Sequence, residues 1–188
     1  MKRLSFIPAL FLGALLAASG HAAETDGHLR PIDPPREIPP IVFEDGEGRQ
    51  HSLSDYRGRY VLLNIWATWC GPCVKEMPSL ENLEKNLGST RFAVVPVSED
   101  RGDPSLVRAF YLRHNINHLP TLIDPAGRAP FILAMPGLPT TLLINPQGRE
   151  IARVEGDVDW NSAEAIDFIR SRIGPNPIVD PIAGSIRL

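Results

Sequence analysis

Residues 60–87 decide the fold, and they read YVLLNIWATWCGPCVKEMPSLENLEKNL. Seven of the first eight residues are apolar, and a run this short and bulky is typical of a strand that is buried on both faces. After position 73 the apolar residues recur every three or four positions, which favours one face of an α-helix. These residues are Val74, Met77, Leu80, Leu83 and Leu87. The sequence therefore predicts a buried strand that leads directly into a helix.

Two cysteines, Cys70 and Cys73, fall at the predicted junction of strand and helix. Unpaired backbone N–H groups and the helix dipole favour negative charge at a first turn, so we expect the thiolate of Cys70 to be stabilised relative to its thiol. Helical residues three apart have Cβ atoms about 5–6 Å apart, and a disulfide needs about 3.8 Å, so the pair can bond after a modest local adjustment. Pro72 lacks an N–H that the first turn leaves unpaired anyway. Gly71 lets the backbone of a partner approach closely.

A Cys-X-X-Cys pair has other uses besides redox exchange. It can be half of a zinc site, but such a site needs further ligands, and the chain has only these two cysteines. An inert structural disulfide is a second alternative. His114 and His118 would reach one metal only on a continuous helix, and Asn115 disfavours continuation. We therefore predict no metal site and no cofactor, and we interpret the cysteines as a redox pair.

The composition fits a soluble domain. The chain has 188 residues, 43% of them hydrophobic, and a formal net charge of −3, which suits one domain with a sizeable core plus extensions. The absence of a dense basic patch from the sequence argues against nucleic acid as the main partner. We expect a monomer.

The N-terminus has the layout of a secretory signal. Lys2 and Arg3 precede an apolar run from Leu4 to Ala18, and small residues follow up to Ala23. We predict a signal peptide over residues 1–23 and a periplasmic location. The alternative is an inner-membrane anchor over residues 4–20, with the domain facing the periplasm. In either case the two cysteines work outside the cytoplasm, where a dithiol must be kept reduced or will oxidise.

Three further parts are expected after this leader. Residues 24–40 hold five prolines and few large apolar residues, so we predict a Pro-rich linker. Residues 41–173 form the folded domain, and residues 174–188 form a C-terminal tail. Inside the domain, an Asp-Gly turn at residues 45–46 predicts a β-hairpin ahead of the central strand.

The remaining elements follow from short patterns along the domain. We expect a strand at residues 91–97, a helix that starts at Asp103 and Pro104, and a strand–helix insertion over residues 121–135. Two strands at residues 142–144 and 150–154 precede a final helix, which Asn161 caps with Glu164 in the capping-box position. This order predicts an α/β fold with helices on both faces of the sheet.

Several of these motifs resemble a known superfamily. WCGPC at residues 69–73 and GLPTT at residues 137–141 are similar to the thioredoxin superfamily. CGPCVKEMP at residues 70–78 and NIWATW at residues 64–69 resemble the TlpA/ResA-like branch, the extracytoplasmic thiol–disulfide oxidoreductases of bacteria. The similarity covers about residues 38–173. It implies a thioredoxin fold, which is a central mixed sheet with helices on both faces, here with an N-terminal β-hairpin and a strand–helix insertion.

The resemblance also implies roles for residues around the cysteines. Pro139 is expected to be a cis-proline packed against the disulfide, whereas from sequence alone cis is the rarer state and an ordinary turn proline is the alternative. A cis bond would turn the backbone of Leu138 towards Cys70, where it could pair with a substrate strand. The expected substrate contacts are Trp69, Gly71, Pro72, Leu138 and Thr140.

Glu76 is the predicted proton carrier. Cytoplasmic thioredoxins have a buried aspartate six residues before the first cysteine, and this chain has Asn64 there. An amide cannot take a proton, so another group must assist when Cys73 is deprotonated. Glu76 lies three residues after Cys73 on the same helix face, and burial would raise its pKa towards neutrality. The alternative is an ordinary solvent-facing glutamate.

Together these features predict a reductase of protein disulfides, in which Cys70 attacks and Cys73 resolves the mixed disulfide. The resemblance suggests apocytochrome c or copper-site proteins as substrates. The sequence has no flavin or nicotinamide motif, so we expect a membrane thiol reductase to donate electrons. A disulfide oxidase or isomerase is one alternative, and a non-catalytic Cu(I)-binding module is another. Peroxidase chemistry is disfavoured, because the threonine and proline expected upstream of a peroxidatic cysteine are not at the right offsets.

Overall fold

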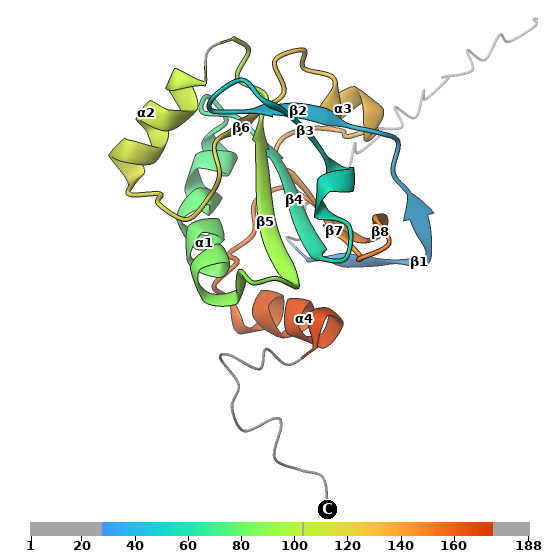
Figure 1. Ribbon diagram of the computed structural model, residues 1–188. Helices are drawn as coiled ribbons and strands as arrows, with labels where there is room; N and C mark the ends of the chain where they lie inside the picture. Colours follow the sequence, from blue (N-terminus) through green and yellow to red (C-terminus); the bar gives the residue numbers. More distant parts are fainter. Residues whose placement is uncertain (1–27, 103, 175–188) are drawn as a thin grey trace, which may run out of the picture.

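The computed structural model describes residues 28–102 and 104–174. Its strands are β1 (Arg30–Glu37), β2 (Val42–Asp45), β3 (Gln50–Ser52), β4 (Tyr60–Trp66), β5 (Phe92–Ser98), β6 (Leu122–Ile123), β7 (Thr140–Ile144) and β8 (Arg149–Glu155). Its helices are the 3-10 helix η1 (Leu53–Tyr56) and the α-helices α1 (Gly71–Leu87), α2 (Ser105–His114), α3 (Ala129–Ile132) and α4 (Ala163–Ile173). The strands form one sheet in the order β1-β8-β7-β4-β5-β6-β2-β3. Figure 1 shows this sheet with helices around it.

Both faces of the sheet are covered. Successive residues of β4 point to opposite faces, as in any strand. Leu62 and Trp66 belong to a core shared with α1, α2 and α4, whereas Leu63 and Ile65 belong to a second core that includes residues of α3 and β2. The predicted α/β fold with helices on both faces, and its thioredoxin-type architecture, are therefore confirmed.

The register of the central strands determines where functional side chains meet. β4 pairs in parallel with β5 and antiparallel with β7, and Ile65 lies opposite Thr140. The end of β4 therefore lies beside the start of β7. This arrangement brings the residues after β4, which include the cysteines, next to the loop that precedes β7.

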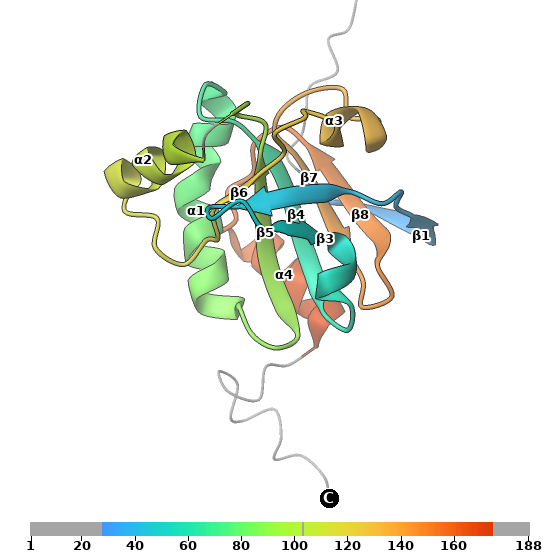
Figure 2. The same cartoon turned by 45° about the horizontal axis from the view of Figure 1, so that its top comes forward.

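The predicted hairpin and insertion are present at the other side of the sheet. β2 pairs with β3, and Phe43 lies opposite His51. β2 also pairs with β6, the short strand of the insertion, so the hairpin extends the sheet beyond β6, as can be followed in Figure 2.

Part of the expected linker is instead an edge strand. β1 pairs antiparallel with β8, and its register shifts between Pro31 and Arg36. An edge strand tolerates prolines because one of its sides needs no ladder donors. Charged contacts help to hold it, since Arg36 Nη2 lies 2.6 Å from Oε2 of the buried Glu150. A reading of local composition could not reveal this pairing across more than 110 residues.

Two expected helix starts need correction. The side chain of Ser162, not Asn161, caps α4, and it accepts a hydrogen bond from the backbone N–H of Ala165. The N-cap residue of α2 is Pro104, which was expected to be the first residue inside the helix, so α2 begins one residue later than predicted. Within residues 28–102 and 104–174, no helix is long and apolar enough to span a membrane. The predicted signal peptide or anchor and nearly all of the predicted tail lie outside the described residues.

Candidate active site

The two cysteines form a disulfide at the start of α1. The sulfur atoms are 2.06 Å apart and the Cα atoms 5.2 Å apart. Cys70 is the N-cap residue of the helix, and its sulfur accepts the backbone N–H of Cys73 at 3.3 Å. Cys70 keeps an exposed fraction of 7% whereas Cys73 is fully buried. An incoming group therefore meets Cys70 first, and a negative charge on its sulfur would face the N-terminus of a helix.

Of the residues expected to contact substrate, three lie exposed beside the cysteines in the chain, whereas Thr140 is fully buried and so cannot contact a substrate directly. Trp69 is 70% exposed, and both Gly71 and Pro72 lie exposed on the first turn of α1. The Leu138–Pro139 bond is cis, as the resemblance implies. Pro139 is buried and Leu138 half-buried. Thr140 Oγ1 donates to the carbonyl of Gly137 at 2.8 Å, which closes the loop ahead of β7.

Glu76 is buried, as expected, and its carboxylate is enclosed by hydrogen-bond donors. Asn64 Nδ2 donates to Oε1 at 2.7 Å. The backbone N–H of Val158 and the indole Nε1–H of Trp160 both donate to Oε2 at 3.2 Å. Burial, with a smaller contribution from the nearby Asp157, raises the pKa of Glu76 to about 7, although these three donors act in the opposite direction. Glu76 can therefore change its protonation state near neutral pH.

The amide of Asn64 suits both protonation states of this carboxyl. Its Nδ2 also donates to Thr141 Oγ1 at 2.9 Å, and its Oδ1 has no hydrogen-bond partner among the described residues. With Nδ2 towards Glu76, the amide donates to the carboxylate. Rotated by half a turn, it would present Oδ1 to accept the proton of a carboxylic acid. The sequence identified both residues but not the hydrogen bond between them.

A second carboxylate braces the loop that carries Trp69 and Cys70. Asp100 is buried and accepts both the backbone N–H of Thr68 at 2.8 Å and its hydroxyl at 2.7 Å. It also accepts the hydroxyl of Ser98 at 2.7 Å. The loop after β4 is thus fixed to the end of β5. No sequence pattern singled out Asp100, because its partners lie up to 32 residues away.

A groove of about 770 Å³ opens beside Trp69 and Leu138. Its other lining residues are Glu99, Asp100, Arg101, Leu106, Gly127, Pro130, Phe131 and Met135. Phe131, on the short helix of the insertion, is 92% exposed. Glu99 Oε1 has no hydrogen-bond partner among the described residues, and burial, with the nearby Asp124, raises the pKa of Glu99 to about 7. Sequence reasoning missed this groove, because separate segments of the chain build it.

The two histidines considered as metal ligands have other contacts. The ring of His114 stacks on Phe110 with centroids 4.2 Å apart, and His118 Nδ1 lies 2.5 Å from Glu81 Oε1. In the part of the chain that the structure describes, no group of three or more His, Cys, Asp or Glu side chains could hold a metal ion.

Comparison with known proteins places this site in a family. The model of the AhpC/TSA family matches residues 34–151. Thiol-disulfide oxidoreductase ResA of Bacillus subtilis (strain 168) is 32% identical over 157 residues, which cover 82% of this chain and 87% of the relative. ResA of Geobacillus thermodenitrificans (strain NG80-2) is 38% identical over 112 residues, 59% of this chain and 63% of the relative.

Solved structures share the fold. A Chlorobium tepidum protein named as a thiol:disulfide interchange protein DsbE superposes with a TM-score of 0.66 at 25% identity, over 76% of this chain and 99% of that chain. A secreted thiol-disulfide isomerase of Corynebacterium glutamicum superposes with a TM-score of 0.63 at 21% identity, over 85% of this chain and 96% of that chain, and this second likeness concerns the fold alone. With a disulfide at the start of α1 and relatives of this kind, the chain is a member of the AhpC/TSA family and belongs to the ResA-like thiol-disulfide oxidoreductases of thioredoxin fold.

Proposed function

We propose that this protein is an extracytoplasmic reductase of protein disulfides. The observation that carries the proposal is the difference in burial between the two cysteine residues: Cys70 has an exposed fraction of 7%, and Cys73 has none. A substrate sulfur therefore exchanges with Cys70, while Cys73 stays inside as the resolving group. The resemblance of residues 1–23 to a secretory signal supports the location.

The reaction begins with the reduced pair. The Cys70 thiolate attacks one sulfur of a substrate disulfide, forms a mixed disulfide, and expels the other substrate sulfur as a thiolate. Cys73 then loses its proton and attacks Cys70, which forms the intramolecular disulfide and expels the second substrate thiolate. Two electrons have passed from the dithiol to the substrate. A membrane thiol reductase would restore the dithiol.

Glu76 would take the proton of Cys73 in the second step. It lies one helical turn beyond Cys73, and its pKa of about 7 lets it accept a proton as a carboxylate and release it at the same pH. The neighbouring amide of Asn64 can donate to the carboxylate before the transfer and accept from the acid afterwards.

A polypeptide substrate would lie over the Leu138–Pro139 loop and extend into the groove beside Trp69. The apolar side chains of Phe131 and Leu106 in that groove are 92% and 52% exposed, and such patches mark binding sites for other chains. Protein disulfides of apocytochrome c or of copper-site proteins are the substrates that we propose from the family resemblance.

Replacement of Cys73 by serine tests the order of attack. The Cys73→Ser variant should accumulate a mixed disulfide through Cys70 with an oxidised protein substrate, whereas Cys70→Ser should accumulate none. Adducts through Cys73 instead would overturn the assignment. The reduction potential tests the direction: a value near −270 mV supports a reductase, and one near −120 mV an oxidant.

A further inference from the structure

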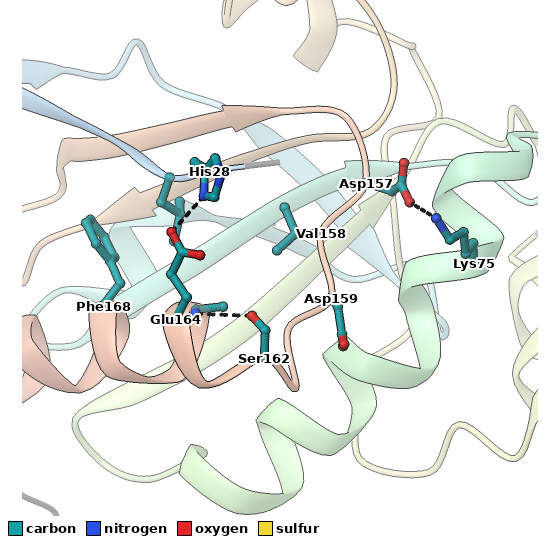
Figure 3. Close-up of a pocket in the computed structure, with 10 residues that line it drawn as sticks. His28, Lys75, Asp157, Val158, Asp159, Ser162, Glu164 and Phe168 are labelled. Carbon is teal, nitrogen blue, oxygen red and sulfur yellow. Dashed lines mark hydrogen bonds and ion pairs between the residues drawn. The ribbon is translucent and has the colours of Figure 1, made fainter. Parts of the chain in front are cut away.

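Lys75 and Asp157 form an ion pair beside the buried Glu76. Lys75 Nζ lies 2.6 Å from Asp157 Oδ2. The pair joins α1 to the loop between β8 and α4, and Figure 3 shows it at one side of a pocket of about 300 Å³. Lys75 precedes Glu76 in the sequence, and Asp157 precedes Val158, whose backbone N–H donates to Glu76. The ion pair thus flanks both partners of this buried hydrogen bond.

The same loop holds most of the donors that reach Glu76. Both Val158 and Trp160 donate to Oε2, and the backbone N–H of Trp160 also donates to Ser79 Oγ at 3.1 Å. The position of the loop on α1 therefore determines whether the carboxylate keeps two of its three donors. The ion pair is the outermost attachment of the loop, because the Lys75 side chain is 78% exposed and that of Asp157 33%.

We propose that Lys75 is a positioning residue for Glu76: its ion pair with Asp157 holds residues 157–160 against α1 and keeps their N–H donors on the Glu76 carboxylate. The role of Glu76 as a proton carrier comes from the proposed function, on which this inference rests. That Lys75 positions the donors of Glu76 is a separate statement about the geometry of the oxidised protein. Lys75 acts on the reaction through Glu76 and not through either sulfur.

The charges in this region give the expected effect a definite sign. The charged or titratable groups that line the pocket are Lys75, Asp157, Asp159, His28 and Glu164. His28 Nδ1 lies 2.7 Å from Glu164 Oε1 on the far wall. The groups that contact the Glu76 carboxylate itself, from β4 and from the loop, are neutral donors. Removal of the Lys75 charge would leave Asp157 uncompensated and would loosen the donors. Both changes disfavour the ionised carboxylate, so both move the pKa of Glu76 upward.

The test is a titration of Glu76 in the oxidised full chain. Carboxyl carbons of ¹³C-labelled glutamate are followed by NMR between pH 4 and pH 9, and the signal that Glu76→Gln lacks identifies Glu76. In Lys75→Gln we expect the pKa of Glu76 to rise by about half a pH unit, the size that a largely exposed ion pair supports. Lys75→Arg should restore the wild-type value. Lys85→Gln is the matched control, since it removes one exposed positive charge from the last turn of the same helix.

The outcomes separate this inference from the proposed function. A Glu76 titration that is the same in Lys75→Gln, Lys85→Gln and wild type would overturn the positioning role. The pH dependence of disulfide reduction, measured on the same variants, tests Glu76 itself. If Glu76→Gln leaves that profile unchanged while Lys75→Gln moves the titration, Glu76 is not the proton carrier but the positioning holds. If Glu76→Gln changes the pH profile of disulfide reduction but Lys75→Gln changes neither that profile nor the pKa of Glu76, the proposed function stands and the positioning role is refuted.

Discussion

The burial of Glu76 predicts an unusual dependence of stability on pH. The pKa of this carboxyl is about 7 in the folded protein, against an ordinary value of 4.5. The folded state therefore binds the proton more tightly than the unfolded state does. Below pH 4.5 the carboxyl is protonated in both states and carries no penalty. As pH rises towards 7, the unfolded chain gains from ionisation that the folded chain lacks, so stability falls.

The size of the effect follows from the difference in pKa. One pKa unit corresponds to about 1.4 kcal/mol, so the penalty amounts to under about 1 kcal/mol at pH 5 and about 3 kcal/mol at pH 8. Glu76→Gln removes the ionisable group and hence this dependence. Relative to wild type, the variant should gain about 2 to 3 kcal/mol of stability between pH 5 and pH 8. Any loss from the exchange of an oxygen for an NH₂ beside Asn64 is the same at both pH values and cancels.

Urea denaturation of the oxidised protein, followed by tryptophan fluorescence at several pH values, measures this gain. The buried Trp160, which contacts Glu76 directly, makes the fluorescence sensitive to unfolding of this region. A stability difference between variant and wild type that stays constant from pH 5 to pH 8 would refute the raised pKa and with it the proton-carrier role.

Two further predictions concern the carboxylates of Asp100 and Glu81. Asp100→Ala should lower stability by about 2–3 kcal/mol and slow disulfide reduction, because it leaves the donors of the half-buried Thr68 and the buried Ser98 without their acceptor. Asp100→Asn, which keeps one acceptor, should lose less, and equal stability of all three proteins would contradict the bracing role. Burial alone would raise the pKa of Glu81, but hydrogen bonds from His118 and from the Asn117 backbone outweigh it, so the pKa is lowered. The ionised Glu81 therefore stabilises the fold above its ordinary pKa of about 4.5, and this stabilisation disappears as pH falls. Thermal denaturation should show that Glu81→Gln loses more stability at pH 7 than at pH 3, and the reverse order would refute the assignment.

The parts of the site that the sequence predicted are the local ones. The apolar run of β4, the periodicity of α1 and the cysteine spacing all lie within residues 60–87, so a strand–helix junction and the placement of Glu76 could be derived from adjacent residues. The cis state of Leu138–Pro139 required the family resemblance, because sequence alone favours trans.

The parts that the sequence could not predict depend on pairing between distant segments. The donors of Val158 and Trp160 reach Glu76 from more than 80 residues away, and nothing in their own neighbourhood marks them. The segment that forms β1 was expected to be a linker because it is rich in prolines and has few large apolar residues. Its contact with the buried Glu150 exists only once β8 is in place. The groove is lined by residues from four separate segments of the chain, so no single stretch of sequence indicates that it exists.

The antiparallel register of β1 also decides from which side the chain enters the folded body. Arg30 lies opposite Arg153, and β8 ends at Glu155, opposite Thr140. The first described residues therefore lie beside the end of β8 that continues into residues 157–160, the segment that supplies two of the three donors to Glu76.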